Sequence, residues 1–65
     1  MKIEMNGEWR HIAAETLASA LEELGLGEAV VATALNGEFV PAPARSATRL
    51  ADGDRLEVLS PMQGG

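Results

Sequence analysis

The sequence predicts an α+β fold in which one mixed sheet of about five strands is covered by one main helix. Three observations lead there: the chain has 65 residues, two stretches alternate in hydrophobicity around Asn-Gly pairs, and one stretch has helical periodicity. A chain of this length forms one domain and has no room for two layers of helices. We expect that domain over residues 1–60 and a flexible tail over residues 61–65.

The chain begins with a predicted β-hairpin. In the segment MKIEM, residues 1, 3 and 5 are apolar and residues 2 and 4 are charged, which is the alternation of a half-buried strand. Asn6–Gly7 follows, and this pair favours a type I′ turn because both of its positions need positive φ. The segment EWRHI is the predicted returning strand. We expect its Trp9 to pack in the core, because Phe39 is the only other aromatic residue of the chain.

Helical periodicity follows in the segment AAETLASALEELGLG. Its apolar residues fall on one helix face: Leu17, Ala20, Leu21 and Leu24. Thr16 is the predicted N-cap, although Ser19 is not the Glu or Gln of a full capping box. Gly25 followed by Leu26 is typical of a helix that ends at a C′ glycine with a hydrophobic contact.

The second half of the chain predicts three more strands. The segment VVATALN is β-branched and aliphatic, which indicates a strand covered on at least one face. Asn36–Gly37 then leads into the short strand EFV, which Pro41 and Pro43 end, so we expect it at an edge of the sheet.

After this strand, PARSATRL is a connection with room for one irregular helical turn, and ADGD is a tight turn with Gly53 at positive φ. RLEVLS is the last strand, with Leu56 and Val58 on one face. Two hairpins that flank a helix, followed by a final strand, form the β-grasp or ubiquitin-like arrangement.

The composition excludes several classes of function. The formal net charge is −5, so nucleic acid would be repelled and a basic partner surface attracted. The chain has no cysteine, which excludes a disulfide, a thiolate nucleophile and a cysteine metal site. The longest apolar run has seven residues and the first residues lack a signal-peptide stretch, so we expect a soluble cytoplasmic protein without a membrane segment.

No residue pattern in the predicted body indicates catalysis or metal binding. His11 is the only histidine and has no nucleophile or further ligand at a suitable spacing, so we interpret it as a solvated or edge residue. Glu22 and Glu23 are adjacent on a helix and diverge by about 100°, which separates their carboxylates. Asp52 and Asp54 lack the later ligands of a calcium loop and are interpreted as turn residues.

The chemistry that remains is in the tail. Pro61 cannot donate a strand hydrogen bond and should direct the chain off the sheet. Five extended residues reach about 17 Å. Gly64 and Gly65 have no Cβ and can pass through a narrow channel, and the terminal carboxylate becomes an electrophile if another enzyme adenylates it. An idle, frayed Gly-Gly end is the alternative.

Several segments together carry a resemblance to a known family: VATALNGEFVP and DGDRLEVLSPMQGG most specifically, and also TLASALEELGL and the NGE after the first strand. With these segments the chain resembles the ThiS family, the small sulfur carrier proteins of thiamin biosynthesis, over nearly its whole length. The resemblance implies that the chain is a protein co-substrate and not an enzyme, and that it binds no cofactor itself.

The resemblance also implies partners and site residues. A ThiF-type adenylating enzyme would use ATP and magnesium to activate the carboxylate of Gly65. A sulfur donor such as a cysteine desulfurase relay would convert it to a thiocarboxylate, which thiazole synthase (ThiG) would use to form the thiazole ring. Gly64 would admit the terminus to both partners, and we hypothesise that Met62 and Gln63 are the part of the tail that the partners hold.

Phe39 and Leu59 lie near the tail in the predicted sheet and form a candidate docking patch. Leu56, on the same strand as Leu59, is a further candidate for this patch, but core packing is an equal or better interpretation of this residue.

Three alternative functions stay open. One is a sulfur carrier like the small subunit of molybdopterin synthase, which also carries a Gly-Gly thiocarboxylate. Another is a ubiquitin-like modifier joined to lysines of target proteins. The last is a β-grasp interaction module with an idle tail, which would keep its function without Gly65.

Overall fold

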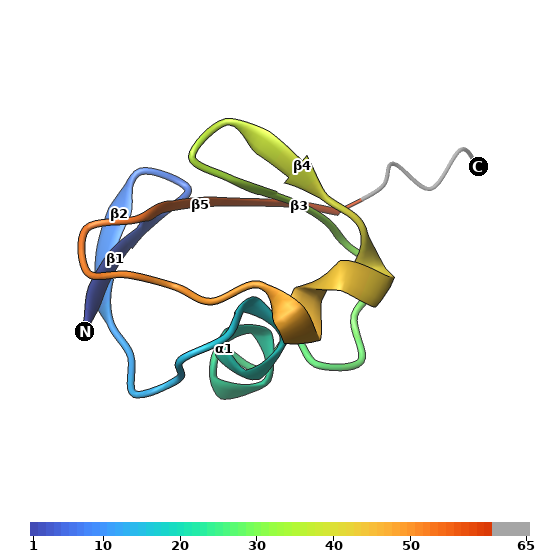
Figure 1. The fold of residues 1–65 in the computed structure, drawn as a ribbon, viewed down its shortest axis with the longest axis horizontal. Coiled ribbons are helices and arrows are strands. Elements are labelled where there is room, and N and C mark those ends of the chain that lie inside the picture. Colours follow the sequence, from blue (N-terminus) through green and yellow to red (C-terminus); the bar gives the residue numbers. More distant parts are fainter. Residues whose placement is uncertain (61–65) are drawn as a thin grey trace.

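The computed structural model describes residues 1–60, and the tail residues Met62, Gln63, Gly64 and Gly65 lie outside the described residues. Within residues 1–60, a five-stranded sheet lies on one side of the core and one α-helix on the other (Figure 1). The elements in chain order are β1 (Lys2–Met5), β2 (Glu8–His11), α1 (Leu17–Glu23), β3 (Ala32–Leu35), β4 (Glu38–Val40), the 3-10 helix η1 (Ala42–Ala47) and β5 (Arg55–Leu59).

The last strand occupies the middle of the sheet. The strand order is β2-β1-β5-β3-β4, with β5 parallel to β1 and antiparallel to β3. Each outer pair is an antiparallel hairpin, so β2 and β4 are the edge strands, as predicted for β4. The predicted α+β fold with a mixed sheet of β-grasp topology is therefore confirmed.

Both hairpins turn at an Asn-Gly pair in the left-handed region. The φ angles are 50° at Asn6 and 87° at Gly7, and 51° at Asn36 and 86° at Gly37. Asn tolerates this region better than other residues with a side chain, and Gly meets no steric penalty there. The positive φ predicted at both turns is confirmed.

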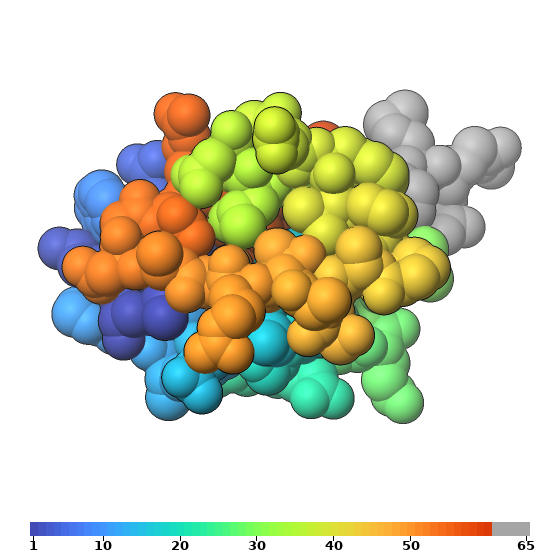
Figure 2. Space-filling model, in the orientation of Figure 1, coloured from blue at the N-terminus to red at the C-terminus, as the bar shows by residue number. Residues whose placement is uncertain are grey.

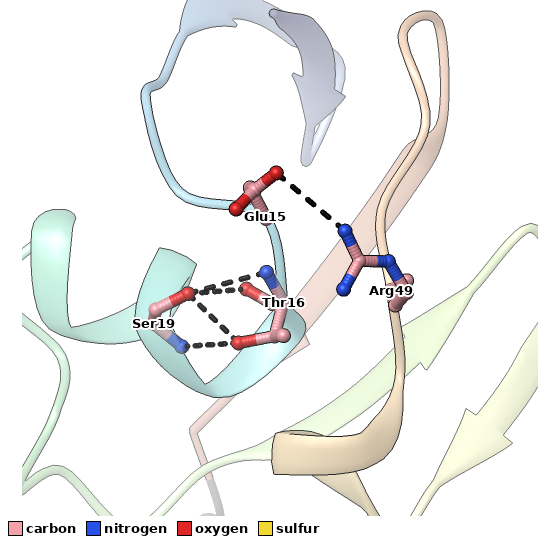
Figure 3. Close-up of polar contacts among 4 residues, drawn as sticks. All are labelled: Glu15, Thr16, Ser19 and Arg49. Carbon is pink, nitrogen blue, oxygen red and sulfur yellow. Dashed lines mark hydrogen bonds and ion pairs between the residues drawn. The ribbon is translucent and has the colours of Figure 1, made fainter.

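The start of α1 corrects one sequence prediction. Thr16 is the N-cap as expected, and its hydroxyl accepts from the Ser19 N–H at 3.2 Å. Ser19 in turn accepts from the Thr16 N–H at 3.2 Å, so the capping box is complete (Figure 3). The expectation that Ser19 would leave it incomplete was wrong, because the hydroxyl is close enough to reach the cap N–H in place of a longer carboxylate.

The end of α1 has the predicted glycine. Gly25 has a φ of 81°, and its N–H donates to Glu22 O at 3.0 Å. The Leu26 N–H donates to Leu21 O at 2.7 Å, which completes the paired hydrogen bonds of a Schellman motif. Leu26 also packs against the core, so the apolar contact predicted with this glycine is present.

A side chain on the last turn of α1 fixes the connection from β2. The carboxylate of Glu23 accepts from the N–H groups of Ala13 and Ala14 at distances of 2.9–3.1 Å. These two donors are consecutive in the chain, so one carboxylate satisfies both. Glu23 therefore ties the segment that enters the helix to the turn that leaves it.

The connection after η1 closes one side of the molecule (Figure 2). It runs beside the start of α1, where the Leu17 N–H donates to Thr48 O at 2.8 Å and the Leu50 N–H donates to Glu15 O at 2.9 Å. The Arg49 guanidinium also lies 3.5 Å from the Glu15 carboxylate (Figure 3). Both of these side chains are largely exposed, so this ion pair contributes little stability.

The core is aliphatic, as the composition predicted. Its buried hydrophobic residues are Ile3, Ile12, Leu17, Ala20, Leu21, Val40, Leu50, Leu56 and Val58. Thr33 is a buried polar residue among them, with its hydroxyl 2.7 Å from Val40 O, to which it donates. The Arg45 guanidinium donates to the same hydroxyl at 3.0 Å and to Val31 O at 2.6 Å, so η1 is tied to the start of β3.

Two further expectations were wrong. Trp9 does not pack in the core and is 55% exposed. It lies opposite Glu4 in the hairpin register, on the side of the sheet that α1 does not cover. The strand predicted from residue 30 begins at Ala32, because Val30 lies outside the ladder and is exposed.

Candidate functional site

One face of the sheet is left uncovered by the helix. Residues directly opposite one another in neighbouring strands share a face, and α1 covers the face that carries Ile3, Leu56 and Thr33. The opposite face is called the open face here. Its residues from the five strands are Lys2, Glu4, Trp9, His11, Ala32, Ala34, Phe39, Arg55, Glu57 and Leu59.

An exposed apolar patch lies on the open face at the end of β5. Phe39 is 69% exposed and lies opposite Ala34, and Leu59 is 64% exposed and lies opposite Ala32. The two alanines between them leave a shallow floor, and Val30 is 79% exposed beside it. These five residues, Val30, Ala32, Ala34, Phe39 and Leu59, are called the exit patch, because β5 ends within it.

A groove of about 420 Å³ continues the exit patch toward the end of the described chain. It is lined by Val30, Val31, Ala32, Leu59 and Ser60. Phe39 and Leu59, which the sequence nominated for docking, are thus on the same face, and Leu59 lines the groove that reaches Ser60. Their docking role stays a prediction. Leu56 is fully buried, which confirms its interpretation as a core residue.

Charged side chains lie beside the exit patch. A second groove of about 580 Å³ is lined by Glu4, Asn6, Gly7, Arg55, Glu57 and Leu59. Arg55 is opposite Glu4 in the parallel ladder, and Glu57 follows on the same side of β5. Leu59 lines both grooves, so a partner seated on the exit patch would also meet this mixed charged surface.

The end of β5 is held from both sides. On one side, Thr33 and Ala32 of β3 pair with Val58 and Leu59. On the other side β1 has already ended, and the side chain of Asn6 takes its place: Val58 N–H donates to Asn6 Oδ1 at 2.8 Å, and Asn6 Nδ2 donates to Val58 O at 3.0 Å. The sequence analysis assigned Asn6 only to the turn, and no local signal points to a contact 52 residues away.

The histidine and the acidic turn residues of residues 1–60 lie in ordinary structural settings. Among residues 1–60 no three His, Cys, Asp or Glu side chains come together at metal-binding distance. His11 lies on the edge strand β2 and is exposed. Asp54 accepts from the Ala51 N–H within the turn, and Asp52 accepts from the Lys2 N–H of β1, both at 2.7 Å, so these acids have structural roles.

The two helices of residues 1–60 also lack the length and apolarity needed to cross a bilayer. The residues expected to carry the chemistry, Met62, Gln63, Gly64 and Gly65, belong to the part of the chain that the structure does not describe.

At the other end of the open face, Trp9 marks a region that sequence reasoning missed. The Lys2 ammonium lies 5.1 Å from the centre of the Trp9 ring, which is a cation–π contact. A signal for the exposure of Trp9 was present in the sequence. The two-residue turn at Asn6–Gly7 places Trp9 opposite Glu4. Because Ile3 is buried, its neighbour Glu4 points to the other face of the sheet, and Trp9 points there with it.

Comparisons with known proteins agree with the fold and with the family that the sequence resembles. The model of the ThiS family matches residues 3–65. A protein of Thermus thermophilus named sulfur carrier protein ThiS is 41% identical over 94% of this chain and 95% of its own length. A crystal structure of a thiamine biosynthesis protein (ThiS) from Geobacter metallireducens has a TM-score of 0.83 and 35% identity, with full coverage of both chains.

One relative is much longer. A protein of Paramagnetospirillum magneticum named thiazole synthase is 38% identical over all of this chain, and this chain spans 20% of that relative's length. That relative therefore contains a segment similar to the whole of this chain, together with a larger part that has no counterpart here.

Proposed function

The chain belongs to the ThiS family, the sulfur carrier proteins of thiamin biosynthesis, and on that premise we propose that its sulfur is carried on the carboxylate of Gly65. The observation that carries the proposal is the similarity to a named sulfur carrier over nearly the full length of both chains. The family match also runs through Gly64 and Gly65. In this function the chain is a protein co-substrate of enzymes and not itself an enzyme.

The proposed first step activates the terminus. A ThiF-type adenylating enzyme binds ATP and magnesium, the Gly65 carboxylate attacks the α-phosphorus, and pyrophosphate leaves. The product is an acyl adenylate, whose carbonyl carbon is far more electrophilic than that of a carboxylate. Among residues 1–60 no three His, Cys, Asp or Glu side chains are grouped to hold a metal ion, which fits the assignment of ATP and magnesium to the partner.

The proposed second step loads sulfur. A sulfur nucleophile supplied by a donor such as a cysteine desulfurase relay attacks the carbonyl carbon of Gly65, and the bond to AMP breaks. With hydrosulfide as the nucleophile the products are AMP, a proton and a terminal thiocarboxylate. The absence of cysteine in the chain fits this assignment, because no side-chain thiol competes as a sulfur carrier.

The proposed acceptor is thiazole synthase, which would take the sulfur into the thiazole ring of thiamin. The support is the relative named thiazole synthase, which contains a segment similar to this whole chain. Two activities joined in one polypeptide in one organism are expected to meet as separate proteins in another. This support favours thiamin over the molybdopterin and protein-modifier alternatives.

We propose that the exit patch docks onto these partners. It is the apolar part of the open face at the end of β5, so a partner seated there lies next to the start of the tail. The net charge of −5 would steer the carrier toward a basic partner, and association should slow as salt screens that attraction.

The experiment is the intact mass of the chain after incubation with ATP, magnesium, a ThiF-type enzyme and sulfide. We expect a gain equal to the exchange of one oxygen for sulfur, and no gain in a variant that lacks Gly65. The matched control is a second carrier on which the same activating enzyme is competent. If that carrier gains sulfur and this chain does not, the proposed function is wrong.

A further inference from the structure

We propose that Asn6 is a positioning residue that fixes the point from which the tail leaves the body. The inference rests on the proposed function, because it matters only if partners must reach the terminus through the tail. Its basis is the contact between the first turn and the last strand, which the geometry of the turn alone does not explain.

The Asn6 amide acts as a substitute for a strand residue. The parallel ladder between β1 and β5 ends at the pair Met5 and Leu56, and the Asn6 N–H still donates to Leu56 O at 3.0 Å. Beyond that point the backbone of β1 turns away into the hairpin. The Asn6 side chain then meets the N–H and the C=O of Val58 at 2.8 and 3.0 Å, as a neighbouring backbone would.

Asparagine is the residue type that meets all the demands of this position. The backbone has a φ of 50°, which Asn and Asp tolerate better than other residues with a side chain. The contact needs one acceptor and one donor on the same short side chain. Glycine would keep the turn without the contact, and an ionised aspartate would have no donor for Val58 O.

The contact lies at the start of the tail. Val58 is bonded by Asn6 on one side and paired with Thr33 on the other, and Leu59 of the exit patch follows it directly. If the last two residues of β5 came loose, the origin of the tail would move by about 7 Å, set against a tail reach of about 17 Å. A partner would then have to order Leu59 and the tail origin as it binds.

The second hairpin provides a matched control within the same chain. Asn36 also starts an Asn-Gly turn, with a φ of 51°. Its side chain accepts from the Arg55 N–H at 2.9 Å and donates to Asp54 at 3.0 Å. These contacts hold the start of β5, at the end of the strand remote from the tail. The two asparagines therefore do similar structural work at opposite ends of one strand.

The experiment compares Asn6→Gly with Asn36→Gly in the full chain. Amide hydrogen exchange by NMR is measured at Val58 and Arg55, together with KM and kcat of each variant as substrate of the activating enzyme. For Asn6→Gly we expect lost protection at Val58 and a rise in KM of roughly three- to tenfold with little change in kcat, from the loss of the paired hydrogen bonds. For Asn36→Gly we expect lost protection at Arg55 and KM within about twofold of the parent chain.

Equal KM values for the two variants would overturn the proposal, since a purely structural role would affect both alike. If Asn6→Gly does not fold, Asn6→Asp keeps the turn and the acceptor for the Val58 N–H but removes the donor to Val58 O, and it is expected to show a smaller rise in KM in the same direction. Rapid exchange of Val58 in the parent chain would also overturn the proposal, without reference to any partner. A parent chain that is not adenylated at all would instead contradict the proposed function, which the exchange measurement does not depend on.

Discussion

Two leucines of the last strand, Leu56 and Leu59, have opposite environments. Leu56 is fully buried beneath α1, and Leu59 is 64% exposed on the open face. They are three positions apart, and an odd spacing along a strand reverses the side of the sheet. One strand therefore supplies a core residue on one side and, on the other, an exposed apolar residue of the proposed docking surface.

This difference suggests a test: residues on the covered side should determine the stability of the fold, and residues on the open face should determine how a partner binds it. A substitution on the covered side removes contacts that hold the body together. A substitution on the open face removes few contacts within the chain and acts only when a partner is present. The predictions below test this separation, and they run from the largest expected effect on the molecule to the smallest.

Leu56→Ala should be the most destabilising change. It leaves a cavity at a fully buried site, which we expect to cost about 2–5 kcal/mol of the free energy of unfolding. A domain of this size has only about 3–10 kcal/mol in total, so the variant should be close to unfolding. Urea denaturation followed by circular dichroism measures the loss, and Leu59→Ala is the control on the same strand. A loss no larger than that of the control would contradict the separation.

Thr33→Val should cause the next largest loss in the free energy of unfolding. Valine has nearly the same shape, but the change removes the hydroxyl that donates to Val40 O and accepts from Arg45. Because the site is buried, we expect a loss of about 1–3 kcal/mol from the groups left without a partner. Thr33→Ser, which keeps both hydrogen bonds, should lose less. The comparison fails if serine is the worse substitution in thermal or urea unfolding.

Glu23→Ala tests whether exposure alone predicts a neutral effect. Glu23 is exposed, yet its carboxylate accepts from the N–H groups of Ala13 and Ala14. We expect a loss of roughly 1 kcal/mol, discounted for solvent screening. Glu22→Ala is the matched control, because the neighbouring carboxylate is also exposed and has no such contact among the hydrogen bonds of residues 1–60. Equal unfolding midpoints for the two variants would show that the Glu23 contact adds nothing.

Leu59→Ala and Phe39→Ala should barely change stability, within about 0.5 kcal/mol, because both side chains are largely exposed. As substrates of the activating enzyme they should show KM raised roughly three- to tenfold, from lost apolar contact with the partner. Trp9→Ala is the control at the far end of the same face, where we expect no change in KM. If Trp9→Ala raised KM more than Leu59→Ala and Phe39→Ala, the docking site would lie near Trp9 and not at the exit patch.

The sequence by itself determined the features that depend on neighbours along the chain. Both Asn-Gly turns, the Thr16 cap and the Gly25 stop need only local backbone geometry, and the structure has them where they were predicted. The alternation in RLEVLS likewise predicted that Leu56 and Val58 share one face, since side chains of a strand alternate between faces. The sequence of the tail also showed the resemblance to the ThiS family. The chemistry of the tail stays a proposal.

Only the tertiary structure decided which distant segments meet. β5 lies at the centre of the sheet, Asn6 is hydrogen-bonded to Val58, and Arg45 is hydrogen-bonded to Thr33. No local sequence pattern predicts any of these contacts. Trp9 was misplaced for a different reason, because composition was given more weight than the local register of the first hairpin. Composition argued that an aromatic residue belongs in the core, whereas the register of an edge strand points it outward. Strand order and the pairing of strands that are distant in the sequence follow from how all the apolar faces pack at once, which is a property of the whole chain.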